Sequence, residues 1–97
     1  MRVYISGAMS GYSEKDITER FCNAERMLKA GGCKVFNPSR WRWFLRYFPY
    51  KVCLAFDIVM MCFCDRVYLL SGWTLSDGAM AEAQFARSTG MVIIYER

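Results

Sequence analysis

Histidine is absent from this chain of 97 residues, and its five cysteines are an odd number. Both facts argue against a zinc site, so we expect no metal. No apolar run approaches the ~18 residues that a membrane-spanning helix needs. No signal-peptide core follows Met1, because the first residues lead directly into a β-type run. We therefore expect a cytoplasmic protein with no membrane partner.

The cysteines also lack the spacing of a redox pair. Cys62 and Cys64 are separated by a single residue, whereas redox-active pairs have two intervening residues. We expect both to be small buried side chains at the end of a helix. Thiols in this number indicate a reducing compartment.

Apolar residues make up 55% of the chain and aromatic residues 16%, which is high for one small domain spanning residues 1–97. A chain of this length buries only about two-thirds of its unfolded surface, so another subunit is expected to cover some apolar surface. We therefore expect a homo-oligomer, a dimer or a higher assembly. The net charge of +4 is mild and forms no basic run, which favours a small anionic ligand over a nucleic acid.

Short β-type runs alternate with helical patterns along the whole chain. The predicted strands are residues 2–6, 33–36, 66–70 and 91–95, and the predicted helices are residues 14–29, 51–64 and 77–88. A further helical stretch is predicted over residues 39–50, with an interruption near Pro49. Right-handed crossovers between such strands produce a parallel sheet with helices on both faces. We predict an α/β fold, a small flavodoxin- or Rossmann-like three-layer sandwich whose four-stranded parallel sheet has the order 2-1-3-4. Ligands bind such sheets outside the carboxyl ends of strands one and three.

Two loops, residues 7–12 and 72–76, end at that edge of the predicted sheet. The first is rich in small residues, so backbone N–H groups and hydroxyls can approach a ligand. It matches neither a Walker A motif nor a dinucleotide fingerprint, and a merely connecting turn is the alternative. The predicted ligand-binding residues are Ser6, Gly7, Met9, Ser10, Gly11, Trp73, Ser76 and Gly78.

Two acidic residues differ from their surroundings. Ser76 is a predicted N-cap, which places Glu82 on the second turn of a helix whose free N–H groups attract anions. Asp57 lies in the otherwise apolar residues 52–62, which indicates a carboxyl group at the rim of an apolar pocket. Two carboxyl groups in unlike environments are what glycosidic bond cleavage requires, one as nucleophile and one as acid.

Less specific interpretations of these features remain open. Glu82 could be solvated on a surface helix, and Asp57 could lie on a solvated stripe or pair with Arg46 or Arg66. The interleaved arginines and aromatics of residues 41–48 could stack on bases, or could form a subunit interface or a cover for the core. A lid over a base pocket is compatible with both.

Several segments carry a resemblance to a known family. They are residues 4–11 (YISGAMSG), residues 35–38 (VFNP), Asp57 followed by Asp65, and residues 72–82, which include Gly72, Trp73, Ser76, Gly78, Ala79 and Glu82. Together they resemble the nucleoside 2-deoxyribosyltransferase-like superfamily, and within it the small phage and bacterial group DUF4406. The superfamily includes transferases that move a 2-deoxyribosyl group between bases and hydrolases that cleave the N-glycosidic bond of deoxynucleoside 5′-monophosphates. Neither activity needs a cofactor, so none is expected.

The resemblance implies roles for four residues. Glu82 matches the nucleophile that attacks the anomeric carbon, and Asp57 matches the group that assists departure of the base by proton transfer. Tyr4 matches a tyrosine that hydrogen-bonds near the nucleophile. Ser76 matches the position at which the hydrolases carry a serine on the phosphate and the transferases an aspartate on the sugar, which favours a 5′-phosphorylated substrate.

Two positions depart from the hydrolase pattern. Ser10 stands where the hydrolases have an arginine, and Ala8 where they have a serine. Arg40, Arg42 or a residue of a neighbouring subunit would have to supply the altered phosphate contacts. Hydrolysis of (deoxy)nucleoside 5′-monophosphates is the leading function. The alternatives are deoxyribosyl transfer, a non-catalytic nucleotide-binding module that senses or sequesters its ligand, and an interaction scaffold with a vestigial cleft.

Overall fold

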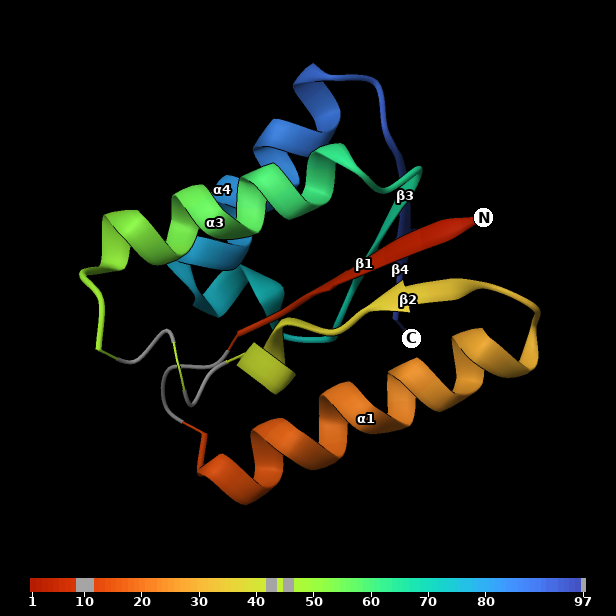
Figure 1. The fold of residues 1–97 in the computed structure, drawn as a ribbon, viewed down its shortest axis with the longest axis horizontal. Helices are drawn as coiled ribbons and strands as arrows, with labels where there is room; N and C mark the ends of the chain where they lie inside the picture. The colour runs from red at the N-terminus through yellow and green to blue at the C-terminus, as the bar shows by residue number, and fades with distance from the viewer. Residues whose placement is uncertain (9–11, 42–43, 45–46, 97) are drawn as a thin grey trace.

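The computed structural model describes residues 1–8, 12–41, 44 and 47–96 (Figure 1). The described strands are β1 (Arg2–Ser6), β2 (Lys34–Phe36), β3 (Arg66–Leu69) and β4 (Val92–Tyr95). The described helices are α1 (Glu14–Ala30), α3 (Tyr50–Cys62), α4 (Asp77–Ser88) and two short 3₁₀-helices, η1 (Pro38–Trp41) and η2 (Trp73–Leu75). The four predicted strands and the predicted helices 14–29, 51–64 and 77–88 are present, with boundaries that differ from the predicted ones by at most two residues. Of the helical stretch predicted over residues 39–50, the described part includes η1, and residues 42, 43, 45 and 46 lie outside the described residues.

The described strands form a four-stranded parallel sheet in the order β2-β1-β3-β4, which confirms the predicted fold class and strand order. Tyr4 on β1 lies opposite Phe36 on β2 and Val67 on β3. In Figure 1, α1 covers one face of the sheet, and α3 and α4 cover the other. The strand order reverses between β1 and β3, so a crevice is expected at their carboxyl ends.

Side chains alternate along β1 and β3, so each face of the sheet has its own buried cluster. The cluster beneath α1 consists of Val3, Ile5, Ile17, Phe21, Ala24, Tyr68 and Leu70. The cluster beneath α3 and α4 consists of Tyr4, Met61, Val67, Leu69, Ala83 and Ala86. The second cluster contains Tyr4, so the core on this side extends directly to the predicted site.

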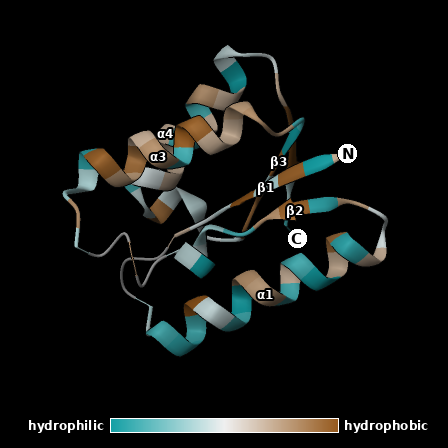
Figure 2. Ribbon diagram, in the orientation of Figure 1, coloured by the Kyte–Doolittle hydropathy of each residue, from teal (hydrophilic) through white to brown (hydrophobic). Residues whose placement is uncertain are grey.

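Helices α1 and α3 differ in how their sequences meet solvent. α1 alternates hydrophilic and hydrophobic positions, whereas α3 is hydrophobic over most of its length (Figure 2). Met61 is nevertheless the one residue of α3 that is classed as buried in the described part of the chain. No described helix is long and apolar enough to cross a membrane.

All five cysteines lie in the described residues, and none of them forms a disulfide. The prediction that Cys62 is buried is wrong, because its side chain is exposed. Met61 points toward the sheet, and the next residue on an α-helix is rotated by about 100° from it, which turns Cys62 outward. Cys64 is half-buried, and its burial raises the pKa of its thiol.

Candidate functional site

A cavity of about 230 Å³ lies at the carboxyl end of β1, between the first turns of α4 and the inner face of α3. The predicted site residues that line it are Tyr4, Ser6, Gly7, Asp57, Ser76, Gly78 and Glu82. These residues come from three separate parts of the sequence, and the fold brings them to one cavity. Met9, Ser10 and Gly11, which were also predicted to bind the ligand, lie outside the described residues.

Glu82 lies on α4 with only 6% of its surface exposed. Tyr4 donates a hydrogen bond from its hydroxyl to Glu82 Oε2 at 3.0 Å, and Ser6 donates one from its hydroxyl to Oε1 at 2.6 Å. Both carboxyl oxygens are therefore held, which fixes the orientation of the group. The alternative of a solvated Glu82 is wrong.

Tyr4 is fully buried, and an aromatic stack holds its ring in place. The ring of Phe36 stacks on it with centroids 5.5 Å apart, and Trp41 stacks on the far side of Phe36 at 6.5 Å. Burial, with the nearby carboxyl groups of Glu82 and Asp57, raises the pKa of the Tyr4 phenol well above its usual value. Tyr4 therefore remains a hydrogen-bond donor throughout the physiological pH range.

Asp57 lies on the inner face of α3 and reaches the same cavity. Its Oδ1 atom is buried and has no hydrogen-bond partner among the described residues. Among the described residues, no ion pair joins Asp57 to Arg66. Arg46, the other predicted partner of Asp57, lies outside the described residues. Burial raises the pKa of its carboxyl group. Asp57 therefore lies at the cavity with its Oδ1 unpaired among the described residues, beside the carboxyl group of Glu82 and the phenol of Tyr4.

Glu82 and Asp57 influence each other's ionisation. Burial raises the pKa of Glu82 to about 8, the charge of Asp57 adds to the increase, and the hydroxyls of Ser6 and Tyr4 oppose it. Two carboxyl groups this close share a proton more easily than both can ionise. With a pKa of about 8, Glu82 is largely protonated at neutral pH in the free protein.

The first turn of α4 forms a polar wall of the cavity. Ser76 accepts a hydrogen bond from the N–H of Ala79 at 3.3 Å, so it is the predicted N-cap, and its own hydroxyl hydrogen remains available to a ligand. A Cβ atom at Gly78 would lie 3.4 Å from the hydroxyl of Tyr50, an ordinary van der Waals distance, so Gly78 and Tyr50 bring α4 and α3 together at the cavity.

The inner face of α3 supplies cavity residues that the sequence did not single out. Tyr50, Cys53 and Leu54 line the cavity together with Asp57. They precede Asp57 by seven, four and three residues, the spacing of one helical face. Once Asp57 is placed at a pocket, this periodicity identifies them. Phe21 and Pro38 also line the cavity, and no local pattern marks them.

Trp73 is not among the described residues that line the cavity. Its ring lies 6.2 Å from the ring of Tyr95, and the guanidinium of Arg87 lies 5.8 Å from its centroid. It also packs against the buried cluster beneath α3 and α4. The structure therefore places Trp73 against β4 and α4, apart from the other predicted site residues.

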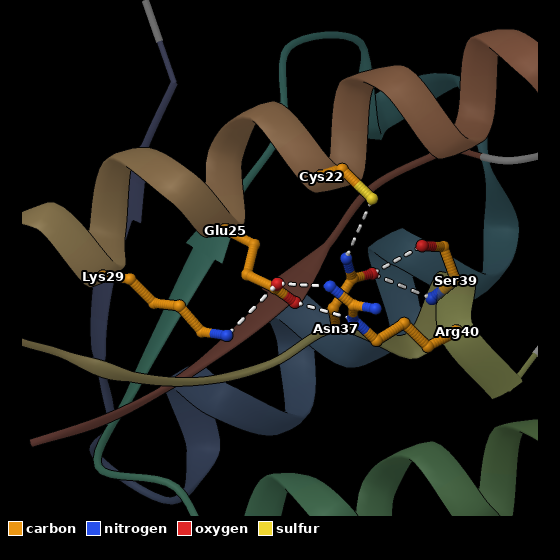
Figure 3. A network of polar contacts seen from close by, with 6 residues as sticks. All are labelled: Cys22, Glu25, Lys29, Asn37, Ser39 and Arg40. Atoms are coloured by element: carbon orange, nitrogen blue, oxygen red, sulfur yellow. Dashed lines mark hydrogen bonds and ion pairs between the residues drawn. The ribbon is translucent and has the colours of Figure 1, made fainter.

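Arg40, one of the candidates for a phosphate contact, is held by an ion pair (Figure 3). Its guanidinium donates to Glu25 on α1, from Nε at 3.0 Å and from Nη2 at 2.6 Å, and Lys29 lies 3.4 Å from the same carboxylate. The hydrogen bond from Arg40 lowers the pKa of Glu25 to about 2. Arg40 is thus occupied in fastening η1 to α1, and Arg42 lies outside the described residues.

The same network shapes the cavity wall. Asn37 accepts hydrogen bonds from the N–H of Ser39 at 3.0 Å and from its hydroxyl at 2.6 Å (Figure 3). These bonds start the 3₁₀-helix η1 directly after β2. Pro38 is thereby held buried at the edge of the cavity.

The described residues contain no group of three or more histidine, cysteine or acidic side chains that could hold a metal ion. Glu82 and Asp57 are the acidic residues among the described lining of the cavity, and no described lining residue is basic. The chemistry that this arrangement supports is therefore that of two carboxyl groups, a phenol and hydroxyls.

Comparison with known proteins adds one finding to this geometry. No curated protein and no solved structure matches the chain significantly. Residues 1–95 match the family model described as "Domain of unknown function (DUF4406)". The match covers the sheet, all the described helices and every residue of the cavity. The chain therefore belongs to the DUF4406 family.

Proposed function

We propose that this protein cleaves the N-glycosidic bond of nucleosides or nucleotides, with (deoxy)nucleoside 5′-monophosphates as the leading substrates and water as the acceptor. The proposal includes membership of the nucleoside 2-deoxyribosyltransferase-like superfamily. One observation carries it: Glu82 is buried and held by Tyr4 and Ser6, and it shares a cavity with Asp57, whose Oδ1 has no partner in the described chain. A positioned nucleophile beside a proton donor is what glycosidic cleavage requires.

In the first step, a carboxylate oxygen of Glu82 attacks the anomeric carbon, and the bond from that carbon to the base nitrogen breaks. Asp57 gives its proton to the departing base, so the base leaves neutral. In the second step, Asp57 takes a proton from water, and the resulting hydroxide displaces Glu82 from the sugar. The free sugar is released, Glu82 is again a carboxylate, and Asp57 again carries its proton.

The shared proton suits this sequence of events. In the free protein the raised pKa of Glu82 favours a protonated Glu82. The bond to the base breaks with positive charge developing on the sugar, which stabilises an ionised Glu82. The proton then resides on Asp57, where the base needs it. Base release should therefore decline as the pH rises above about 8, where Glu82 loses the proton that Asp57 has to pass to the base.

The phosphate of the substrate is assigned to the start of α4. The hydroxyl of Ser76 and the free N–H groups of the first turn attract negative charge there. No described lining residue supplies a cation, so these neutral donors carry the contact.

Incubation with a panel of nucleosides and 5′-monophosphates tests the proposal, with free base followed by chromatography. Intact-mass analysis should detect a glycosyl adduct that peptide mapping places on Glu82. Transfer of the sugar to an added base, without hydrolysis, would favour the transferase alternative. Binding of a nucleotide without base release or adduct would favour the binding module, an outcome consistent with a protonated Glu82.

A further inference from the structure

The polarity of α3 is reversed relative to that of an ordinary surface helix. Val52 and Val59 are 46% and 51% exposed, and Ala55 and Cys62 on the same stripe are also exposed. These positions recur every three or four residues, so they form one outward-facing row, which we call the outer stripe. The charged Asp57 of this helix lies on its inner side, at the cavity.

A helix at the surface of a globular protein normally carries polar residues on its outward face, and a helix that is apolar on all sides is normally buried. α3 is coloured as hydrophobic over most of its length in Figure 2, yet Met61 is its one buried residue in the described structure. The outer stripe therefore requires a cover that the single chain, as described, does not provide.

The two ends of α3 offer different surfaces. Around its carboxyl end, a hollow of about 300 Å³ is lined by Phe36, Met60, Phe63 and Cys64, together with Val35 and the cations Arg2 and Lys34. Before its amino end, Phe48 is 42% exposed, and its ring contacts that of Phe44. One end thus offers a partly exposed aromatic ring, and the other end offers a hollow of apolar side chains and two cations, both of which can pack on such a ring.

We propose that the outer stripe is the interface of a homodimer in which α3 packs antiparallel to α3 of a second copy. A single register joins the features of both ends: Phe48 meets the hollow at Phe63 of the partner subunit, and Val52 meets Val59 of the partner subunit. Ala55 then lies next to the twofold axis. The smallest side chain of the row stands where the helices approach most closely, and each contact is made twice.

The exposed apolar area along the outer stripe is large enough for an interface with a second copy of the chain. Phe48, Val52, Val59 and Phe63 together leave on the order of 400 Å² of largely apolar surface uncovered. A standard interface buries about 800 Å² per partner, of which somewhat more than half is apolar. The row therefore supplies the apolar centre of an interface of ordinary size.

The charges on α3 disfavour a lipid surface. Helices that lie on membranes carry a polar face rich in lysine and arginine. Lys51 is the one basic residue of α3, and Asp57 is its one acidic residue. Without a basic face, α3 has no electrostatic attraction to anionic lipid, and a second apolar stripe is the better partner.

Sedimentation analysis of the whole protein tests the interface without substrate, so its outcome does not depend on the proposed function. We expect a dimer at micromolar concentration, and Val59→Lys should weaken dimerisation by at least tenfold, about 1.4 kcal/mol. Met27→Lys is the matched control, because Met27 on α1 is 54% exposed and lies off the stripe. It should leave the dissociation constant unchanged.

Cysteine cross-linking tests the orientation, in a Cys62→Ser background that removes the exposed thiol. Val52→Cys and Val59→Cys, placed in one chain, are about 10 Å apart along the helix, too far for an internal disulfide. An antiparallel pair should give disulfides between position 52 of one copy and position 59 of the other. Val52→Cys alone should give none, whereas a parallel pair would join the two copies of position 52.

A chain that stays monomeric at 100-fold higher concentration, about 100 μM, would overturn the proposal. So would a dimer that Val59→Lys leaves intact, or cross-links between identical positions. Monomers that sediment with neutral phospholipid vesicles would replace the second copy by a lipid surface. If Val59→Lys fails to fold by circular dichroism, Ala55→Lys at the twofold axis provides the same comparison.

Discussion

Glu25 and Glu82 are buried to nearly the same degree, with 5% and 6% of their surfaces exposed, but their surroundings are opposite. Glu25 faces Arg40 and Lys29, and its pKa is lowered to about 2. Glu82 faces Asp57 and two hydroxyls, and its pKa is raised to about 8. Little of either side chain is exposed, yet Glu25, which lies near the surface beside its cations, is an anion, whereas Glu82, which lies deeper and beside a second carboxyl group, is a titratable acid.

Under the proposed function, this difference separates a structural glutamate from a catalytic one. The attraction of Arg40 and Lys29 offsets the cost of removing the Glu25 carboxylate from water, and the ion pair with Arg40 connects η1 to α1. Glu82 has hydroxyl donors but no cation in the described part of the chain, so its ionised form is costly in the empty cavity. That cost falls when positive charge develops in front of it, which is what a nucleophile for a sugar needs.

The largest effect is expected from removing the carboxyl group of Glu82. Glu82→Ala should lower the rate of base release by at least roughly 10³-fold, because the proposed mechanism forms the glycosyl intermediate on this carboxyl group. At pH 4, where Glu82 is mostly protonated in both the folded and the unfolded chain, the melting temperature should change little, since a carboxyl group that faces a cavity contributes little packing. Glu25→Gln, assayed below its melting temperature, should retain most of the activity. Full turnover by Glu82→Ala would contradict the nucleophile assignment.

The pH dependence of stability should distinguish the two glutamates next. Between about pH 4.5 and 8, folded Glu82 holds a proton that the unfolded chain has lost, so its contribution to stability decreases as the pH rises. Glu82→Gln should remove this decrease and gain on the order of 2 kcal/mol over the parent at pH 9, with little difference at pH 4. Urea unfolding at a series of pH values measures it. If the free energies of unfolding of parent and variant changed with pH in parallel, the pKa of Glu82 would not be raised in the folded protein.

Glu25 should show the reverse dependence with a smaller amplitude. Its pKa is lowered, so its contribution to stability is present above about pH 4.5 and is lost as the pH falls toward 2. Glu25→Gln should cost about 1–2 kcal/mol at pH 7, since Arg40 is largely exposed and solvent screens the pair. The cost should vanish near pH 2. Chemical denaturation at pH 7 and pH 2 tests this, with Glu19→Gln on the exposed side of α1 as the control.

The smallest effect concerns the anion site at the start of α4. Because the cavity has no described cation, the preference for 5′-monophosphates over nucleosides should be modest, at least roughly tenfold or about 1.4 kcal/mol. Ser76→Ala should erode the preference and leave nucleoside turnover nearly unchanged. Ser76→Asp should reverse it, because its charge repels the phosphate. Equal kcat/KM values for both substrate forms in the parent protein would favour the transferase or the binding module.

Local sequence patterns were sufficient to predict the fold. The β-type runs, the helical periodicity and Ser76 as an N-cap depend on neighbours in the chain, and the right-handed crossover rule converts their order into the observed sheet. The positions of Tyr4, Asp57 and Glu82 at one cavity followed from that topology together with the resemblance.

Contacts between distant segments decided what the sequence could not. Arg40 was predicted as a candidate phosphate ligand, but in the structure its guanidinium is hydrogen-bonded to Glu25 of α1. Trp73 was predicted to contact the ligand, but its ring packs against Tyr95. Each involves partners that are separated by at least 15 residues, so no local pattern records it. The pKa of Glu82 is decided in the same way, because it depends on a carboxyl group of another helix and on the water that both exclude. The sequence by itself therefore determined the elements, their order and the acidic residues, and the tertiary structure decided which of those acids is neutralised by cations and which is left to titrate.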